Sequence, residues 1–365
     1  MTENELLLKI KSIPIVDRDA MDKAAKHQAQ LAKPPGSLGA LEEYAVRLAG
    51  ITGEVCPKIN RCRVLVLAAD NGVVAEGVSS APQSVTASQC INMTRHKTGM
   101  SALAHYFGDE IVVADVGVAA DLPAPILNCK IRYGSRNIAI EPAMTRQETV
   151  DAIAVGMTLA EQAKKDGVDV LGIGEMGIGN TTTSAAVLSA LTGLSTEQVT
   201  GRGGGLTDAG FVRKKEVISR ALNRQPINED DTVDILHQVG GLDIAAMCGA
   251  FLGCAMCGMP AVVDGFISVV AALCACRLCP MVKDYLFLSH ASYEIGYRVA
   301  AKELGLQPCL LLGMRLGEGS GCPLMFRILQ SACACHRDMA TFDEAAINDD
   351  YLTPIRTGES FEVKR

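Results

Sequence analysis

The sequence predicts an α/β protein with a doubly wound, mostly parallel sheet. Short β-branched apolar runs, such as RVLVLAAD ending at Asp70 and VDVLGIGE ending at Glu175, are separated by segments of helix length. Two further runs follow the same pattern, PAVVD ending at Asp264 and CLLLGMRLGEGSG carrying Glu318. Because parallel strands end at one edge of such a sheet, we expect these four carboxylates to face one crevice.

The chain begins with two expected helices. The first covers residues 19–32 and is ended by Pro34 and Pro35, and the second starts at Ser37 as its N-cap. Strands then alternate with helices, and we place them near residues 62–69, 110–116, 168–173, 261–263, 285–288 and 308–313. A further helix follows Gly321. These patterns predict a small helical domain from residues 1–58 and 338–365 and a large α/β catalytic domain from residues 59–337.

Composition limits the class of protein. The chain has 365 residues, of which 48% are hydrophobic and 21% charged, which is typical of a globular protein. A net charge of -7 without a Lys/Arg cluster argues against a nucleic-acid partner. The first residues lack a secretory cleavage pattern, so we expect a cytoplasmic protein without a membrane partner. The uncharged stretch 244–263 is long enough to span a membrane, but we favour a buried helix that turns at Gly258 and Pro260 into a strand.

Fourteen cysteines need an explanation in a compartment where disulfides are rare. The pairs Cys254/Cys257 and Cys276/Cys279 have the spacing of a zinc site, but they lie in apolar, helix-forming sequence rather than in polar turns. We interpret them as small core residues, as we do Cys333, Cys335 and His336, and we expect no bound metal.

Gly172, Gly174 and Gly177 form a GxGxxG pattern after an expected strand, which by itself indicates an NAD-dependent dehydrogenase. Glu175, however, lies inside the loop that would hold the pyrophosphate, and its charge would repel that group. We therefore prefer a carboxylate beside a helix start, with Asn180 and Thr181 capping the helix or binding a ligand.

The segment TGRGGGLTDAGFVRKKEV predicts an anion site. Its glycines, among them Gly203 and Gly204, allow successive N–H groups to converge on a phosphate, and Lys214 follows. The alternative is a surface loop before a solvated basic helix.

Three further acidic or hydroxyl groups follow glycines or expected strands. Asp243 stands after two glycines, where it caps a helix or binds a ligand, and Ser292 follows an expected strand together with His290, which we interpret as structural. Glu318 is the strongest candidate for chemistry. It lies between Gly317 and Gly319, so a ligand can approach the backbone closely.

Eight ordered motifs between residues 13 and 337 give the sequence a family resemblance. They are KPPGSLG, ADNGV, EGV with SVTASQCINMTRHKTG, GEMGIGNTT, GGLD, VDGFIS, LSHASYEIG and MRLGEGSG. Together they resemble the nicotinate-nucleotide:dimethylbenzimidazole phosphoribosyltransferases. The resemblance implies a Rossmann-like domain with a small helical domain from both termini, a homodimer, and an enzyme that needs no cofactor.

The resemblance also implies roles for individual residues. Glu318 matches the family's catalytic base and Glu175 its other active-site carboxylate, while Gln89 matches the glutamine that lines the benzimidazole pocket. The remaining expected substrate-binding residues are Gly177, Asn180, Thr181, Gly203, Gly204, Lys214, Asp243, Ser292 and Leu316.

The expected reaction moves the 5-phosphoribosyl group of nicotinate mononucleotide to 5,6-dimethylbenzimidazole, giving α-ribazole 5'-phosphate and nicotinate for the lower ligand of cobalamin. A heterocycle that attacks through one ring nitrogen must lose a proton from the other, and a positioned carboxylate accelerates such a step by about 10² to 10⁴. The alternatives are a dehydrogenase and a nucleotide-binding protein without catalysis.

Overall fold

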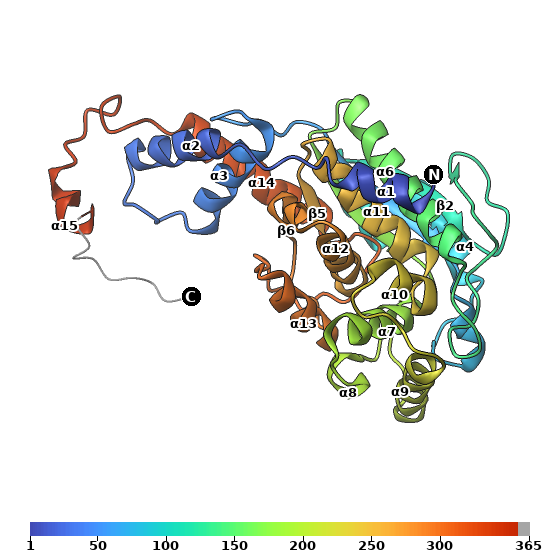
Figure 1. The fold of residues 1–365 in the computed structure, drawn as a ribbon. Helices are drawn as coiled ribbons and strands as arrows, with labels where there is room; N and C mark the ends of the chain where they lie inside the picture. The colour runs from blue at the N-terminus through green and yellow to red at the C-terminus, as the bar shows by residue number, and fades with distance from the viewer. Residues whose placement is uncertain (357–365) are drawn as a thin grey trace. The chain divides into compact units, whose positions relative to one another are not determined.

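The computed structural model describes residues 1–356. Its centre is one sheet of six parallel strands in the order β3-β2-β1-β4-β5-β6. Figure 1 labels β2, β5 and β6 among the surrounding helices. The strands are β1 (Cys62–Ala69), β2 (Glu110–Gly117), β3 (Leu127–Asn128), β4 (Val170–Met176), β5 (Ala261–Val263) and β6 (Leu286–Leu288). Since all six run in one direction, their carboxyl ends meet at a single edge.

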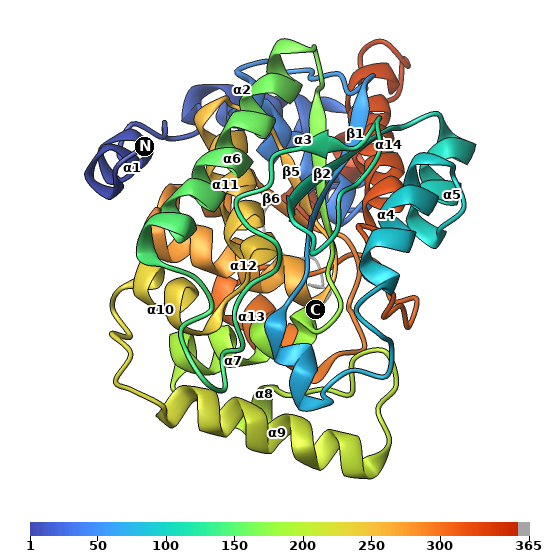
Figure 2. The same ribbon diagram turned by 90° about the vertical axis from the view of Figure 1, so that its right-hand side faces the viewer.

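Helices cover both faces of the sheet, as Figure 2 shows. On one face α11 (Leu242–Met256) and α12 (Phe266–Leu278) pack on the central strands, and α6 (Arg146–Lys165) packs on α11. On the other face lie α4 (Val85–Thr94) and α5 (Gly99–Phe107). This arrangement confirms the predicted doubly wound α/β fold.

Five of the six predicted strands are present, with ends that differ by a few residues. The strand predicted at residues 308–313 is wrong, because this segment forms only an isolated bridge between His290 and Leu310. Its leucines do not reach the core: Leu311 is 82% exposed. The prediction also missed β3, whose two residues are too few to give a sequence pattern.

The uncharged stretch 244–263 is a buried helix followed by a strand, as predicted. Residues 242–255 of α11 are all buried, and β5 begins five residues after the helix ends at Met256. Within residues 1–356, no helix has the combined length and apolar composition needed to cross a membrane.

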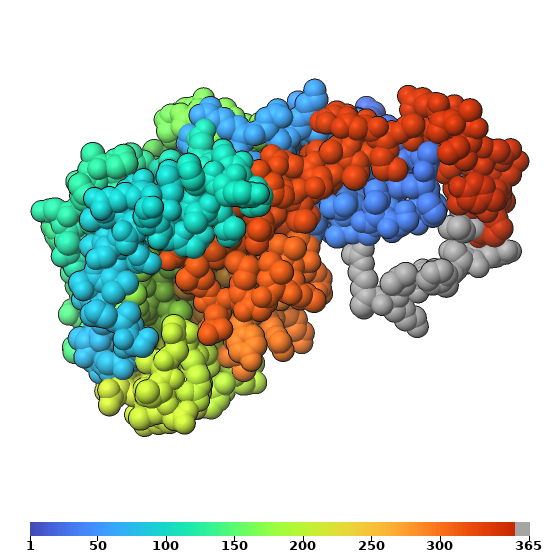
Figure 3. All heavy atoms as spheres, turned by 180° about the vertical axis from the view of Figure 1, so that it is seen from behind, coloured from blue at the N-terminus to red at the C-terminus, as the bar shows by residue number. Residues whose placement is uncertain are grey.

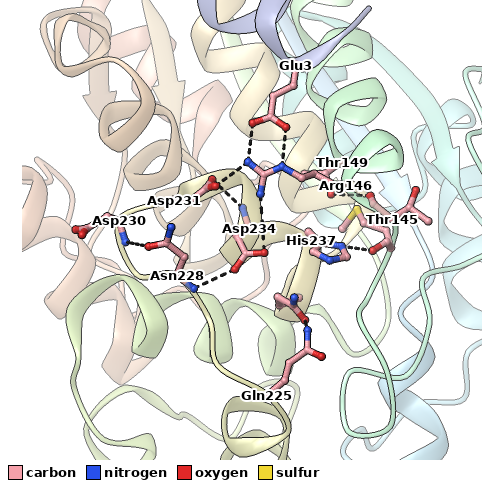
Figure 4. A network of polar contacts seen from close by, with 12 residues as sticks. Glu3, Thr145, Arg146, Thr149, Gln225, Asn228, Asp230, Asp231, Asp234 and His237 are labelled. Atoms are coloured by element: carbon pink, nitrogen blue, oxygen red, sulfur yellow. Dashed lines mark hydrogen bonds and ion pairs between the residues drawn. The ribbon is translucent and has the colours of Figure 1, made fainter.

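The chain divides into two compact units. The larger contains residues 1–14 and 61–326, and the smaller contains residues 15–60 together with the described residues that follow 326. The N-terminal helix α1 (Glu3–Ile10) belongs to the larger unit because Arg146 of α6 binds it: its Nε and Nη2 atoms each lie 2.6 Å from a carboxylate oxygen of Glu3. Figure 4 shows that the same guanidinium also pairs with Asp231. The domain boundaries drawn from the sequence stay a prediction.

The smaller unit joins helices from both ends of the chain. It holds α2 (Arg18–Gln30), α3 (Ala40–Thr52) and the later turns of α14 (Cys322–Asp338), the helix predicted after Gly321. The predicted N-cap at Ser37 is wrong: α3 begins later, after Gly39, whose positive φ of 56° ends the preceding turns. The predicted tail helix is short, α15 (Thr353–Arg356), and residues 357–365 lie outside the described residues.

The other helices are short or lie around the site, namely α7 (Asn180–Thr192), α8 (Thr196–Val199), α9 (Asp208–Asn223), α10 (Thr232–Val239) and α13 (Ile295–Leu304), with the 3-10 turns η1 (Gly72–Glu76), η2 (Pro280–Tyr285) and η3 (Asp350–Leu352).

Candidate active site

A cavity of about 260 Å³ lies in the larger unit beyond the carboxyl ends of the strands. Figure 3 shows a hollow on this side, between the cyan segments around α4 and α5, the yellow-green segment that enters α9 and the orange segments after β6. The residues that line it and that the sequence had singled out are Gln89, Glu175, Gly177, Asn180, Thr181, Gly203, Gly204, Ser292, Leu316 and Glu318.

Glu318 reaches this cavity from the loop before α14. Its side chain is buried, and the Gln89 amide of α4 donates a hydrogen bond to its Oε1 at 3.3 Å. Asn92 in turn donates to the Gln89 oxygen at 3.1 Å, which fixes the orientation of that amide. The carboxylate is thus held at the wall where α4 faces the loop, with apolar side chains such as Val85 and Leu316 beside it.

Glu175 and Asp243 form a second acidic group, bridged by Asn180. The Asn180 amide donates to Glu175 Oε2 and to Asp243 Oδ2, the latter at 3.0 Å. Glu175 Oε1 accepts the backbone N–H of Glu318 at 3.2 Å. Asn180 is therefore not the N-cap of α7, which is Gly179, but the residue that holds two carboxylates together at the start of that helix.

Burial controls the protonation of these acids. It raises the pKa of Glu175 to about 8, with the nearby charge of Asp243 acting in the same direction and the Asn180 hydrogen bond opposing it. Burial likewise raises the pKa of Asp243 to about 6. The pKa of Glu318 is also raised by burial, against the opposing effects of the Thr98 hydroxyl and the Met100 amide. A carboxylate with a raised pKa is a stronger base than an exposed glutamate.

The opposite part of the cavity is suited to an anion. The first turn of α7 borders this part of the cavity through Asn180 and Thr181 and has no side-chain cap, and a helix N-terminus favours an anion. Gly203 has a φ of 56°, and a Cβ there would lie 2.9 Å from Thr181 Oγ1. Lys214, on α9, donates to the same hydroxyl at 2.7 Å. Glycine N–H groups, a helix N-terminus and one cation thus meet at one place.

Lys214 lies one layer behind the cavity wall. The side chain is buried, and burial lowers the pKa of its ammonium group to about 8, while Glu294 raises it. Glu294 itself lines the cavity, and its Oε2 is buried without a hydrogen-bond partner among the described residues. Glu294 is not among the residues predicted from the sequence, although it follows Ser292 by only two positions in the LSHASYEIG motif.

The predicted site residues thus lie together, with ten lining the cavity and Lys214 and Asp243 contacting Thr181 and Asn180 of its wall. The expectation that four strand-end carboxylates face one crevice is wrong for two of them. Asp70 accepts the backbone N–H of Ala119 at 2.8 Å instead. Asp264 likewise accepts backbone N–H groups of the loop after Gly317 and does not line the cavity.

The GxGxxG pattern has a packing role in this fold. Gly172 and Gly174 lie inside β4, where a Cβ would come within 2.5 Å of Cys322 Cβ and 2.6 Å of the Glu318 carbonyl oxygen, respectively. Both glycines allow the loop before α14 and the helix itself to lie directly on the sheet. The pattern therefore does not form the phosphate loop of a dinucleotide site.

The cysteine pairs lie at helix ends. Cys254 and Cys276 are in the last turns of α11 and α12, and burial raises the pKa of both thiols, which disfavours the thiolates that zinc needs. In the smaller unit, His27, Cys56 and His336 have possible ligand atoms within 4.8 Å of one another. Both ring nitrogens of His336 are already hydrogen-bonded, to Gln28 at 2.7 Å and to the Val55 carbonyl at 2.8 Å.

Comparison with known proteins gives the class of this one. A family model described as a phosphoribosyltransferase, DBI_PRT, matches residues 13–347, and the chain therefore belongs to this phosphoribosyltransferase family.

Individual relatives are more specific. The nicotinate-nucleotide–dimethylbenzimidazole phosphoribosyltransferase of Clostridium perfringens is 49% identical over 361 residues, which are 99% of each chain. The enzyme of the same name from Ruminiclostridium cellulolyticum is 46% identical over 348 residues, 95% of this chain and 98% of that one. The crystal structure of CobT from Thermus thermophilus superimposes with a TM-score of 0.87 at 40% identity, covering 91% of this chain and 99% of that chain.

Proposed function

We propose that this phosphoribosyltransferase moves the 5-phosphoribosyl group of nicotinate mononucleotide to 5,6-dimethylbenzimidazole, forming α-ribazole 5'-phosphate and nicotinate for the lower ligand of cobalamin. The observation that carries the proposal is Glu318, a buried carboxylate held by Gln89 at the wall of a cavity that also contains an anion subsite. The relatives described above carry the name of this reaction over almost the whole chain.

Glu318 acts as the general base in this proposal. The heterocycle lies against the apolar wall near Val85 and Leu316, with one ring nitrogen toward the ribose and the N–H of the other toward Glu318. As the first nitrogen bonds to C1', the ring would become cationic unless the second loses its proton to the carboxylate. Burial raises the pKa of Glu318, which suits the group to this transfer.

Glu175 and Asp243 offset positive charge on the sugar. The bond from C1' to nicotinate lengthens as the new bond forms, and the ribose then gains oxocarbenium character, as in glycosyl transfer generally. Two carboxylates bridged by Asn180 at the base of the cavity provide negative charge there. Nicotinate departs with a neutral ring nitrogen, so its departure needs no acid.

The phosphate occupies the subsite formed by Gly203, Gly204, the start of α7 and the pair Thr181–Lys214. Binding a dianion there also returns positive charge to Lys214, since the anion favours the protonated ammonium. Binding energy from this remote group orients C1' between the two substrates.

We further propose that the protein works in the cytoplasm as a homodimer. None of the fourteen cysteines, all of which lie within the described residues, is joined in a disulfide, which fits a reducing compartment. Large apolar side chains are solvent-exposed in the single chain: Leu316 of the cavity wall by 56%, Tyr293, next to the cavity residue Ser292, by 76%, and Leu311 by 82%. A second copy that covers them would also close the cavity.

The replacement Glu318→Gln tests the proposed function. It keeps the size and the Gln89 contact but removes the base, so turnover should fall by at least about 10². Purified protein is given nicotinate mononucleotide and dimethylbenzimidazole, and both products are quantified by chromatography. Calorimetry should show that both substrates still bind to the variant.

The matched control is Glu303→Gln, the same chemical change at the surface of α13. It should retain full turnover. A wild-type protein that releases no nicotinate would remove the proposed function, and near-normal turnover in Glu318→Gln would remove Glu318 as its base.

A further inference from the structure

The loop that carries Glu318 has an unusual backbone. Gly317, Glu318 and Gly319 have φ angles of 85°, 64° and 84°, all in the left-handed region. Glycine adopts this region freely, but a glutamate does so only at a cost. The conformation of Glu318 is therefore imposed by its surroundings, and the interactions that impose it also decide where its carboxylate lies.

Asp264 makes the main interactions that hold this loop. Its Oδ2 accepts the N–H of Gly319 at 3.0 Å, and its Oδ1 accepts the N–H of Gly321 at 2.7 Å. Together with the Glu318 N–H, which points to Glu175, the loop directs three N–H groups at protein carboxylates. Backbone N–H groups that converge in a turn commonly bind an anion in this way. Here the anion is the protein's own side chain.

Asp264 is itself fixed to the sheet. It follows β5 directly and is 2% exposed. Its backbone N–H donates to Ser268 Oγ at 3.1 Å, and that hydroxyl donates to the Ile173 carbonyl of β4 at 3.0 Å. Ser289, after β6, donates to the Asp264 carbonyl at 3.2 Å. Asp264 thus connects the loop to the ends of β4, β5 and β6.

We propose that Asp264 is a positioning residue for Glu318. By binding the backbone N–H groups of Gly319 and Gly321, which follow Glu318, it holds the Glu318 carboxylate at the distance and angle that proton transfer from the heterocycle requires. This inference rests on the proposed function. Asp264 touches neither substrate, since it does not line the cavity, so its effect passes entirely through the loop.

The fit around the loop leaves it little freedom to compensate. A Cβ on Gly321 would lie 2.4 Å from His290 Nδ1 and from Ser289 Oγ, and 3.0 Å from Asp264 Oδ1. A Cβ on Gly319 would lie 2.9 Å from Val64 of β1. Because the loop is packed against Val64 on one side and against His290 and Ser289 on the other, the cavity is the direction left open to it when the Asp264 anchor is lost.

The replacement Asp264→Asn tests the proposal. Its amide keeps one acceptor oxygen but turns an NH₂ group toward a backbone N–H, so one anchor bond is lost. Because a misplacement of about 1 Å can cost about 10² in rate, we expect kcat to fall by about 10 to 100-fold. KM for each substrate should stay within about threefold, since the apolar wall and the phosphate subsite are unchanged.

Asp115→Asn is the matched control. Asp115 is also 2% exposed at a strand end, and it also accepts two backbone N–H groups, of Gly117 at 3.1 Å and of Val118 at 2.8 Å, but in a loop without a proposed catalytic group. It should lose at least as much stability as Asp264→Asn, because Asp115 also pairs with Lys130 at 2.7 Å, while kcat stays within about threefold. Equal losses of kcat in both variants would overturn the proposal, because a general effect on stability would then explain them.

Two further measurements make the result decisive. Gly321→Ala keeps the Asp264 side chain but displaces the loop that it binds, so it should show the same loss of kcat with unchanged KM, including where Asp264→Asn fails to fold. Amide hydrogen exchange of residues 317–321 should become faster in Asp264→Asn, a result that does not depend on activity. Unchanged exchange overturns the positioning role, whereas an inactive wild type overturns the proposed function instead.

Discussion

At the scale of single residues, the buried negative charge of Glu175 lowers the free energy of unfolding at neutral and alkaline pH. A buried carboxylate with a neighbouring acid binds its proton more tightly in the folded chain than in the unfolded one, and the pKa of Glu175 accordingly rises from 4.5 to about 8. The folded state therefore holds more protons than the unfolded state between these values. The contribution of Glu175 to the free energy of unfolding is therefore greatest below pH 4.5 and is lost as the pH rises through about 8.

Glu175→Gln should remove that loss. Urea unfolding between pH 5 and pH 9 is expected to show the wild type losing up to about 1.4 kcal/mol per pH unit relative to the variant as the pH rises to about 8. Asp243, whose pKa is raised to about 6, acts in the same direction over a narrower interval. Parallel pH profiles of wild type and Glu175→Gln would contradict the argument, and Glu303→Gln should leave the profile unchanged.

At the scale of elements, the packing of α6 on α11 fixes the helical layer behind the site. The two helices touch through glycines: a Cβ on Gly156 would lie 1.8 Å from the Ala246 carbonyl oxygen, and one on Gly249 would lie 1.9 Å from the Ile153 carbonyl oxygen. Because α11 also carries Asp243 in its first turn, the distance between these helices bears on the site.

Gly156→Ala should push the two helices apart. Overpacking of this kind costs about 1 to 3 kcal/mol in free energy of unfolding, although alanine is the better helix former. The control is Gly210→Ala in α9, where the nearest atom to a new Cβ is the flexible Leu206 side chain at 3.1 Å. Thermal and urea unfolding should show a loss only in Gly156→Ala. Two variants of equal stability would show that the helices can separate without cost.

At the scale of the whole molecule, the distribution of apolar surface favours association. Leu311 and Leu312, which the sequence analysis assigned to a strand, are 82% and 57% exposed and lie close in sequence to the cavity residue Leu316. Exposed leucines so close in the chain support the proposed homodimer, since a second copy could bury them.

The proposed homodimer can be tested by Leu312→Arg. Light scattering should give the wild type a mass of twice 38.5 kDa and shift the variant toward the monomer, with lower turnover because the cavity is left open. Leu8→Arg, on α1, changes a residue that is 68% exposed and should have no effect on mass. A monomeric wild type would contradict the homodimer, and a variant that stays dimeric would locate the interface elsewhere.

The residues predicted for the site lie around one cavity because most of them follow strands whose carboxyl ends meet at one edge of the sheet. Local sequence could not separate the carboxylates that line the cavity, Glu175 and Glu318, from Asp70 and Asp264, which bind backbone amides. All four follow the same kind of apolar run, and what each side chain contacts depends on loops far away in the chain. The same reason explains why Glu294 was missed and why the GxGxxG glycines suggested a phosphate loop.

By itself the sequence determined the alternation of strands and helices and the family, because apolar periodicity and motif order can be read directly along the chain. Only the tertiary structure decided that Asn180 joins Glu175 to Asp243, that Lys214 reaches Thr181 and that Asp264 holds the loop of Glu318. Three of these four hydrogen bonds join residues that are 33 to 63 positions apart. Their geometry is set by close packing of strands and helices, which no local pattern records.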